Sequence, residues 1–454
     1  MKTSLIQKYN VPGPRYTSYP TVPYWDEATF SNELWLESVK KSFSQSNSAE
    51  GISLYIHLPF CESLCTFCGC FKRITKNHAV EEPYIKAVLK EWTLYTELFD
   101  KKPIIKEIHL GGGTPTFFSG NNLQDLINGI FALAHKHENC EMSFEGHPNN
   151  TTREHLQKLY DLGFRRVSFG VQSYSEIVQK AIHRIQPFEN VAKVTYLARE
   201  IGYTSISHDL IYGLPFQTLD DIYDTIEKTK SLFPDRLAFY SYAHVPWIKG
   251  NGQRGFKDED VPKDEQKRQM YEEGKRKLDE SGYLEIGMDH FALPQDAMTV
   301  AFHKGNLHRN FMGYSASKTQ LMVGLGVSAI SDSWFGFGQN VKSFDEYYDM
   351  LHADTIPVNK GHILTEEDLI VRKHILNIMC KFHTTWSTDQ TYFDGIPTVL
   401  PQLKEFEQDG LLEFIIDGIQ ITEKGKAFVR NICMAFDMRL QRKAPERQLF
   451  SLTI

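Results

Sequence analysis

Four of the chain's seven cysteines lie within ten residues of one another. The stretch CESLCTFCGC, residues 61–70, contains Cys61, Cys65, Cys68 and Cys70, separated by three, two and one residues. Thiolates bind zinc and iron–sulfur clusters, and paired thiols carry out redox chemistry. This stretch is therefore the first candidate in the chain for a chemical role.

Three kinds of thiol site compete for this pattern. A structural zinc site commonly pairs two CxxC knuckles across a longer span, and the sequence has no second knuckle. A redox CxxC is present from Cys65 to Cys68, but it leaves Cys61 and Cys70 unexplained. An iron–sulfur cluster needs several thiolates together. The spacing favours a cluster over the other two sites.

Composition narrows the class of protein. The chain has 454 residues, 41% of them hydrophobic, and 50 basic against 57 acidic residues give a net charge of −7. This balance predicts a soluble globular protein that binds neither nucleic acid nor an anionic membrane. The longest apolar run, residues 321–330, is too short to span a bilayer, and residues 1–10 do not resemble a signal peptide. We therefore expect a cytoplasmic location, where clustered cysteines are more often metal ligands or catalytic groups than disulfides.

Short apolar segments alternate with segments of helical periodicity, as in parallel β/α units. The predicted strands are 52–58, 105–113, 141–148, 165–173, 205–215 and 236–244, and helical spacing is found at 82–98, 151–162, 188–200 and 218–231. Six such units predict an α/β fold, a partial (β/α)6 TIM-like barrel or curved open sheet.

Polar or glycine-rich residues follow each predicted strand. They are the cysteine loop, GGGTPT at 111–116, Glu145, Gln172, Asp209, and the pair Ala243 and His244. Parallel α/β folds place their chemistry at the carboxyl ends of the strands. We therefore expect one site at this edge. The glycines either form only a tight turn or allow a ligand to approach the backbone, and beside the cysteines the second role is favoured.

The pattern changes after residue 250. A helix is predicted at about 263–280, and residues 403–432 follow the order helix, hairpin, helix, which resembles a winged helix. Without a dense basic stripe, a capping domain is favoured over a DNA-binding one. We predict an N-terminal arm (1–45), a barrel with a C-terminal extension (46–345) and a mainly helical, winged-helix-like C-terminal domain (346–454).

Motifs along the chain resemble those of a known protein family. The CxxxCxxC spacing resembles the signature of the radical S-adenosylmethionine (SAM) superfamily. Taken in order from about residue 10 to 440, the motifs resemble the oxygen-independent coproporphyrinogen III oxidases of that superfamily: PGPRYTSYPT (12–21), YIHLPFCESLCTFCGC (55–70), GGGTPT (111–116), FGVQS (169–173), DLIYGLP (209–215), MDHFALP (288–294), RNFMGY (309–314) and GLGVSAIS (324–331). The narrower markers are PRYTSYP and the fourth cysteine of CxxxCxxCxC.

The resemblance implies a reaction and its cofactors. Three thiolates, from Cys61, Cys65 and Cys68, hold a [4Fe-4S] cluster whose fourth iron binds SAM, so Cys70 is not expected to be a ligand. A 5′-deoxyadenosyl radical removes hydrogen from the propionates of coproporphyrinogen III, and two of them become the vinyls of protoporphyrinogen IX in haem biosynthesis. Two SAM molecules are expected. The expected partners are an electron donor such as flavodoxin or ferredoxin and an unknown terminal electron acceptor, and a monomer is the family expectation.

Site residues follow from the same resemblance. Positions matching SAM contacts are Tyr55, Phe67, Gly112, Gly113, Thr114, Glu145 and Ile330, and those matching contacts of a second SAM are Gln172, Arg184, Asp209 and Ala243. Cys70 and His57 are the candidate catalytic residues, with His57 either modulating the cluster or relaying a proton. For each polar side chain the alternative is a structural hydrogen bond.

Substrate contacts are open to two interpretations. Arg15 and Arg309 are expected either to meet propionates or to form salt bridges. Tyr16 and Tyr19 either pack on a tetrapyrrole or anchor the N-terminal arm. The chain departs from the family pattern in two places, with Gly146 and His147 after Glu145, and with Met312 where glutamine is common. Both departures bear on the identity of the tetrapyrrole.

Three other functions are weighed against the oxidase. Related haem chaperones share the barrel and the cysteine triad, but they usually lack the fourth cysteine and PRYTSYPT, both present here. A radical SAM methyltransferase that opens the haem ring is the second alternative. A winged-helix regulator, which would bind duplex DNA, is the third.

Overall fold

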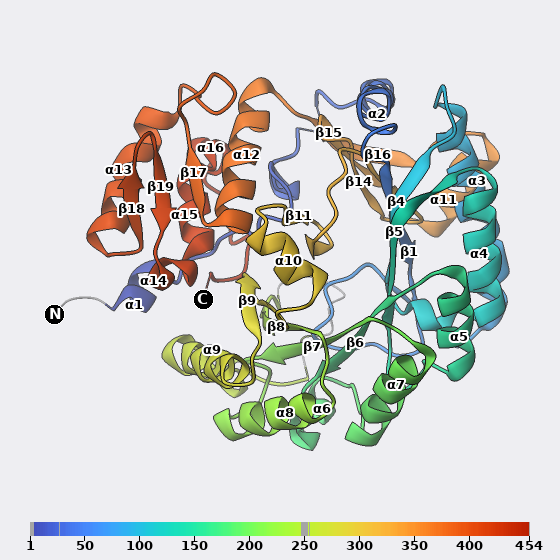
Figure 1. The fold of residues 1–454 in the computed structure, drawn as a ribbon, viewed down its shortest axis with the longest axis horizontal. Helices are drawn as coiled ribbons and strands as arrows, with labels where there is room; N and C mark the ends of the chain where they lie inside the picture. Colours follow the sequence, from blue (N-terminus) through green and yellow to red (C-terminus); the bar gives the residue numbers. More distant parts are fainter. Residues whose placement is uncertain (1–3, 27, 247–252, 254, 454) are drawn as a thin grey trace.

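One large sheet organises the molecule (Figure 1). The computed structural model describes residues 4–26, 28–246, 253 and 255–453. Within them, twelve strands pair in the order β16-β15-β14-β13-β1-β4-β5-β6-β7-β8-β10-β9. The run from β13 to β8 is parallel, and the strands outside it are antiparallel to their neighbours. The sheet is therefore an open partial barrel, which confirms the predicted α/β class.

The parallel strands are β1 (Ile52–Leu58), β4 (Ile104–Gly112), β5 (His135–Gly146), β6 (Arg166–Gln172), β7 (Ser205–Tyr212), β8 (Arg236–Ser241) and β13 (Met322–Leu325). The antiparallel strands at its two edges are β9 (Leu284–Gly287), β10 (His290–Ala292), β14 (Ile330–Asp332), β15 (Gly336–Asn340) and β16 (Val358–Ile363). Two predicted strands end early, because the chain leaves the sheet at Tyr212 and Ser241. One begins early, because the polar residues from His135 pair with β4.

Helices cover the outer face of the curved sheet (Figure 1). They are α3 (Glu81–Glu97), α4 (Gly120–Ala132), α5 (Arg153–Leu162), α6 (Glu176–Ala181), α7 (Phe188–Ile201), α8 (Leu219–Ser231) and α9 (Asp264–Asp279). Leu54, Ile56 and Ile108 of the strands are buried with Val88 and Trp92 of α3 in one core. Helix α4 was not predicted, because it opens with Gly-Asn-Asn, residues of low helix propensity.

The C-terminal region has a core of its own. Its elements are α12 (Glu366–Lys381), β17 (His383–Thr385), α13 (Ile396–Gln408), β18 (Leu412–Ile415), β19 (Gly418–Ile421), α14 (Glu423–Lys426), α15 (Val429–Phe436) and α16 (Met438–Arg442). The strands form a small antiparallel sheet, as the winged-helix-like pattern predicts. Strand β16 still pairs with β15 in the large sheet. The division at residues 345 and 346 stays a prediction.

The N-terminal arm connects these two cores. Tyr9, at the end of α1 (Leu5–Tyr9), stacks on Phe406 with ring centroids 5.1 Å apart. Tyr16 is buried and donates a hydrogen bond to Asp437 over 3.0 Å, and Tyr19 is buried in the same core. Helix α2 (Asn32–Ser46) places Trp35 in the core of the large sheet. The two tyrosines therefore anchor the arm, which is the second of their two predicted roles.

Smaller elements complete the fold. They are β2 (Phe60–Cys61), β3 (Arg73–Ile74), α10 (Ala297–His303), β11 (His308–Asn310), β12 (Gly313–Ser315) and α11 (Phe344–His352). Within the residues the structure describes, no helix is long and apolar enough to cross a membrane.

Candidate active site

Two adjoining cavities lie at the carboxyl ends of the parallel strands. The cysteine cavity, of about 440 Å³, is lined by all four clustered cysteines and by the predicted residues Phe67, Gly112, Gly113, Thr114, Glu145, Gln172, Arg184 and Asp209. The Tyr55 cavity, of about 480 Å³, is lined by Tyr55, His57, Phe311, Met312 and Ile330 among others. Cys70, Gly112 and Glu145 line both cavities. The cysteine loop, Gly112 and Gly113 of GGGTPT, Glu145, Gln172 and Asp209 therefore belong to one continuous site, whereas Ala243 and His244 line neither cavity.

Backbone contacts close the cysteine loop on itself. Strand β2 pairs in parallel with β3, so the chain on both sides of the loop is fixed. The Cys68 N–H donates to the Cys65 carbonyl over 3.2 Å, and the Lys72 ammonium donates to the carbonyls of Cys68 and Cys70 over 3.2 and 3.3 Å. The Thr66 N–H donates to the Ile182 carbonyl over 3.1 Å. These contacts hold the cysteine loop at the carboxyl ends of the parallel strands.

The thiols differ in their readiness to ionise. Burial raises the pKa of Cys61 to about 11, while a 3.3 Å hydrogen bond from the Thr114 hydroxyl favours its thiolate. A hydrogen bond with Cys70 lowers the pKa of Cys68 to about 6 and raises the pKa of Cys70 well above its ordinary value. Cys68 and Cys70 therefore share one hydrogen bond, and the assignment of Cys68 as a ligand and Cys70 as a non-ligand stays a prediction.

The donor set fits an iron–sulfur cluster better than a single ion. Across the described ranges, no three His, Cys, Asp or Glu side chains converge closely enough to hold one metal ion. In a cluster each thiolate binds a different iron, so convergence on one point is not required. Arg184 Nη1 lies 3.5 Å from Cys65 Sγ, and Lys72 also lines the cavity. Their positive charges compensate thiolate charge.

The glycines at the end of β4 are required by close packing. Gly112 has φ +115°, and a Cβ there would lie 2.7 Å from the His57 ring. A Cβ on Gly113 would lie 2.6 Å from the Pro59 carbonyl carbon. Both residues also line the cysteine cavity, and the Gly112 N–H donates to Glu145 Oε2 over 3.3 Å. GGGTPT thus combines the tight turn with exposure of backbone to the cavity.

Asp209 of β7 and Arg184, which follows helix α6, supply charged groups to the same cavity. Burial raises the pKa of Asp209 to about 7, although the Ser168 hydroxyl donates to its carboxylate over 2.9 Å. Arg184 donates from Nη2 to the Gly170 carbonyl over 2.8 Å, and its buried Nε has no hydrogen-bond partner among the described residues. A partner-free guanidinium nitrogen beside a cavity suits a ligand with an anionic group.

His57 connects strand β1 to the cysteine loop. Its Nε2 lies 3.0 Å from the Phe71 carbonyl and its Nδ1 lies 3.0 Å from the Tyr55 hydroxyl. Nε2 therefore donates to the carbonyl, and Nδ1 accepts from the hydroxyl. Burial lowers the pKa of His57 to about 4, so the ring is neutral at pH 7. Both ring nitrogens of His57 are thus engaged within the protein, and its two predicted roles, modulating the cluster or relaying a proton, stay predictions.

Some predicted residues lie outside both cavities. Ala243 lines neither, and its carbonyl accepts a hydrogen bond from Gln253 over 3.0 Å. Arg15 pairs with Asp289 over 2.9 Å. Arg309 is buried over the Tyr314 ring, 4.6 Å from its centroid, and donates to the Arg15 carbonyl. Arg15 therefore takes the salt-bridge alternative, whereas Arg309 has no carboxylate partner within the part of the chain described.

Other residues at the site were not predicted. His109 lines the Tyr55 cavity, its Nδ1 lies 2.8 Å from the Ser143 hydroxyl, and it pairs in register with Tyr55. His109 lies within the predicted strand 105–113, and side chains alternate between the two faces of a strand. This alternation could have placed His109 on the opposite face from Ile108 and Leu110. Ser168 and Phe311 carried no such signal, because their roles depend on long-range packing.

The two departures from the family pattern both face the site. His147 Nδ1 accepts a hydrogen bond from the Asn149 N–H over 3.2 Å, as an Asp or Asn oxygen does in such turns. Burial lowers the pKa of His147 to about 3, and the neutral ring lines the cysteine cavity. Met312 lines the Tyr55 cavity beside Phe311. The turn is therefore retained, while the Tyr55 cavity gains an apolar side chain.

Comparison with known proteins identifies the family. Residues 55–229 match the model of the Radical SAM superfamily. The chain is 38% identical to the oxygen-independent coproporphyrinogen III oxidase of Escherichia coli K12 across 98% of this chain and 97% of that protein. It is 36% identical to the Synechocystis protein of the same name, across 99% and 97%. The chain belongs to the oxygen-independent coproporphyrinogen III oxidase family.

A solved structure of this oxidase family supports the assignment. The structure described as "Coproporphyrinogen III oxidase (HemN) from Escherichia coli is a Radical SAM enzyme" superposes with a TM-score of 0.87 at 36% identity, covering 93% of this chain and 97% of that chain. Membership of the radical SAM oxidases implies a [4Fe-4S] cluster and SAM. The cysteine cavity supplies a donor set that fits them.

Proposed function

We propose that this enzyme converts coproporphyrinogen III to protoporphyrinogen IX without oxygen, by removing carbon dioxide and hydrogen from two propionates. The nearly full-length similarity to oxidases of that name supports the reaction. One structural observation supports this reaction in the present chain. The cavity that holds the clustered cysteines adjoins a second cavity, and Cys70, Gly112 and Glu145 line both. A cofactor in the first cavity and a substrate in the second would share a wall.

The residues of the cysteine cavity would hold the cofactors. Cys61, Cys65 and Cys68 would bind the cluster, and Phe67, Gly112, Gly113, Thr114 and Glu145, with Tyr55 and Ile330, would bind SAM. Gln172, Arg184, Asp209 and Ala243 are proposed to contact a second SAM, although Ala243 lies outside the cavity. When bound, the reduced cluster and SAM supply the radical that takes hydrogen from an unactivated carbon.

The charges of the cysteine cavity suit a zwitterionic ligand. Glu145 is half-exposed and is held by the Gly112 N–H, so it can accept hydrogen bonds from an ammonium or ribose hydroxyls. Arg184 offers its Nε to a carboxylate. Asp209, whose pKa burial raises to about 7, holds a proton in a large share of molecules at neutral pH. It can therefore donate as well as accept.

The Tyr55 cavity is proposed as the substrate site. Its walls include the apolar side chains of Phe311 and Met312, the residues Tyr55, Ile330 and Glu145 that are also proposed to contact SAM, and one lysine, Lys342. Such walls exclude water around a tetrapyrrole, and a lysine can pair with a propionate. His57 holds the Tyr55 hydroxyl on this wall. We also propose that the enzyme acts as a monomer reduced by a flavodoxin or ferredoxin.

An anaerobic conversion assay tests the function. The reconstituted enzyme is incubated with a reductant, SAM, an electron acceptor and coproporphyrinogen III, and the porphyrins are analysed by mass spectrometry. The proposal predicts loss of two carbon dioxides and four hydrogens per tetrapyrrole, absent in Cys65→Ser. Recovery of unchanged coproporphyrinogen with tight haem binding would contradict it and favour the chaperone.

A further inference from the structure

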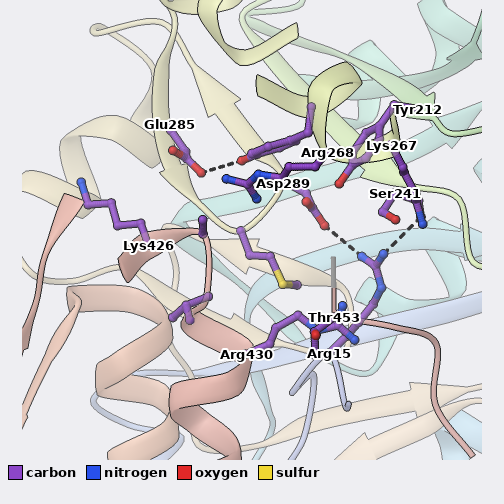
Figure 2. Close-up of a pocket in the computed structure, with 14 residues that line it drawn as sticks. Arg15, Tyr212, Ser241, Lys267, Arg268, Glu285, Asp289, Lys426, Arg430 and Thr453 are labelled. Carbon is purple, nitrogen blue, oxygen red and sulfur yellow. Dashed lines mark hydrogen bonds and ion pairs between the residues drawn. The ribbon is translucent and has the colours of Figure 1, made fainter. Parts of the chain in front are cut away.

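A small cavity lies where the N-terminal arm, the sheet and the C-terminal region meet. This junction cavity, of about 40 Å³, shares no lining residue with the cysteine or Tyr55 cavities. Figure 2 shows side chains from distant parts of the chain turned toward it. Its lining residues include Arg15, Ser241, Lys267, Asp289, Arg430 and Thr453.

Positive charge is in excess in this wall. Arg15 donates from Nη1 to Asp289 over 2.9 Å and from Nη2 to the Ser241 carbonyl over 3.2 Å (Figure 2). Arg430 donates only to backbone carbonyls, those of Gly13, Pro14 and Leu452. Lys267 Nζ donates to the Tyr242 carbonyl over 3.0 Å. Among the described residues, neither Arg430 nor Lys267 forms an ion pair, so one carboxylate faces three cations.

The other charged groups in the wall are already paired. Glu285 accepts a hydrogen bond from Tyr271 over 2.7 Å and pairs with Lys275. Lys426 pairs with Glu423 over 2.6 Å, and Arg268 pairs with Glu272. These pairs do not offset the charge of Arg430 and Lys267.

Burial makes this excess charge unfavourable. Burial first, and then repulsion from Arg15, lowers the pKa of Arg430 to about 9 and the pKa of Lys267 to about 8. Arg430 also opposes the charge of Lys267. Buried charges are normally paired with an opposite charge, because desolvation costs several kcal/mol per ion. The cavity lies where a compensating anion would relieve both cations.

We propose that the junction cavity binds one small anion, either a halide or a single carboxylate or phosphate group, between Arg430, Lys267 and Arg15. A volume of about 40 Å³ is roughly three times the space that one water requires, so a chloride ion or a carboxylate head fits and a bulky buffer anion does not. The bound anion links the arm, helix α9 and the C-terminal region, and it stabilises their junction.

Two sources supply this chemistry. One is a free anion from solution. The other is a propionate of the bound tetrapyrrole, and this second source rests on the proposed function. The experiments below separate the two sources, and their main measurements do not use turnover.

Crystals of the full chain soaked in sodium bromide give a direct test. We expect an anomalous bromide peak between Arg430 and Lys267 that is lost in Lys267→Met. This substitution keeps the stem that packs on Gly213 and removes the charge. Lys263→Met, which changes the exposed lysine at the N-cap of the same helix, should retain the peak.

Thermal unfolding supplies the second measurement. Potassium chloride and potassium acetate should stabilise the wild type more than potassium HEPES at equal ionic strength. Lys267→Met should raise the chloride concentration for half-maximal stabilisation by about tenfold or more, since a charged hydrogen-bond donor is lost. Absence of a bromide peak, together with equal responses to chloride and HEPES in the wild type, would overturn the proposal.

Binding of coproporphyrin III, the oxidised and unreactive form of the substrate, distinguishes the sources. If Lys267→Met weakens its binding and chloride competes with it, the anion is a propionate. If its affinity is unchanged while the bromide peak is present, the anion is free. Failure of the decarboxylation assay would leave the bromide and salt results standing, so the two proposals fail separately.

Discussion

Glu91 is a buried carboxyl group whose protonation is expected to affect the stability of the fold, and it contacts the turn that leads to the wall of the Tyr55 cavity. The side chain lies on α3, fully buried, and accepts hydrogen bonds from the Gly326 N–H (2.8 Å), Asn340 Nδ2 (2.7 Å) and the Tyr347 hydroxyl (2.6 Å). Gly326 begins the turn that leads to Ile330 on that wall. Replacing Glu91 by glutamine removes its ionisation and keeps its size.

The size of the effect follows from the pKa. Burial raises the pKa of Glu91 from 4.5 to about 7, while the three hydrogen bonds act in the opposite direction. Between pH 4.5 and about pH 7, Glu91 is therefore mostly protonated in the folded state and mostly ionised in the unfolded state. The resulting stability is complete below about pH 4.5 and is lost as pH rises through about 7, which amounts to about 3 kcal/mol.

Urea unfolding from pH 4.5 to 8 measures this contribution. Other raised carboxyls, such as Asp209 and Asp437, act in the same range, so the difference between wild type and Glu91→Gln is the informative quantity. We expect that difference in the free energy of unfolding to fall by about 3 kcal/mol across the range. Glu82→Gln, an exposed substitution on the same helix, should leave the slope unchanged. Parallel curves for wild type and Glu91→Gln would show that folding does not raise the pKa of Glu91.

Three further predictions concern the site. Cys70→Ser should keep the iron content of the wild type and lower turnover, whereas Cys61→Ser should lose iron; equal iron loss measured in both would make Cys70 a ligand. His57→Phe should reduce retention of iron, because the Phe71 carbonyl loses its donor, without removing an ionisation from the activity profile between pH 6 and 8, because His57 is neutral there. His147→Asp should change the free energy of unfolding by less than about 1 kcal/mol in urea, because an Asp oxygen can accept the Asn149 N–H in the same turn; a larger loss would show that packing of the imidazole ring dominates.

Local patterns predicted the site better than they predicted its surroundings. Strand β1 spans the predicted residues 52–58, and parallel strands necessarily bring Glu145 and Asp209 to one edge. By contrast, β5 starts in the polar stretch from His135, where pairing with β4 overrides the weak strand pattern. The Arg15–Asp289 pair joins residues 274 positions apart, and Glu91 meets Asn340 and Tyr347 only through tertiary packing. No sequence periodicity reports such contacts.

Transfer of deuterium reports directly whether a SAM-derived radical removes hydrogen from the substrate. Coproporphyrinogen III deuterated at the propionate carbons next to the tetrapyrrole ring is incubated with the reduced enzyme and SAM, and the 5′-deoxyadenosine is analysed by mass spectrometry. We expect one deuterium transferred to 5′-deoxyadenosine for each vinyl group formed. Vinyl formation with unlabelled 5′-deoxyadenosine, or with the deuterium released to water, would contradict removal of hydrogen by a SAM-derived radical.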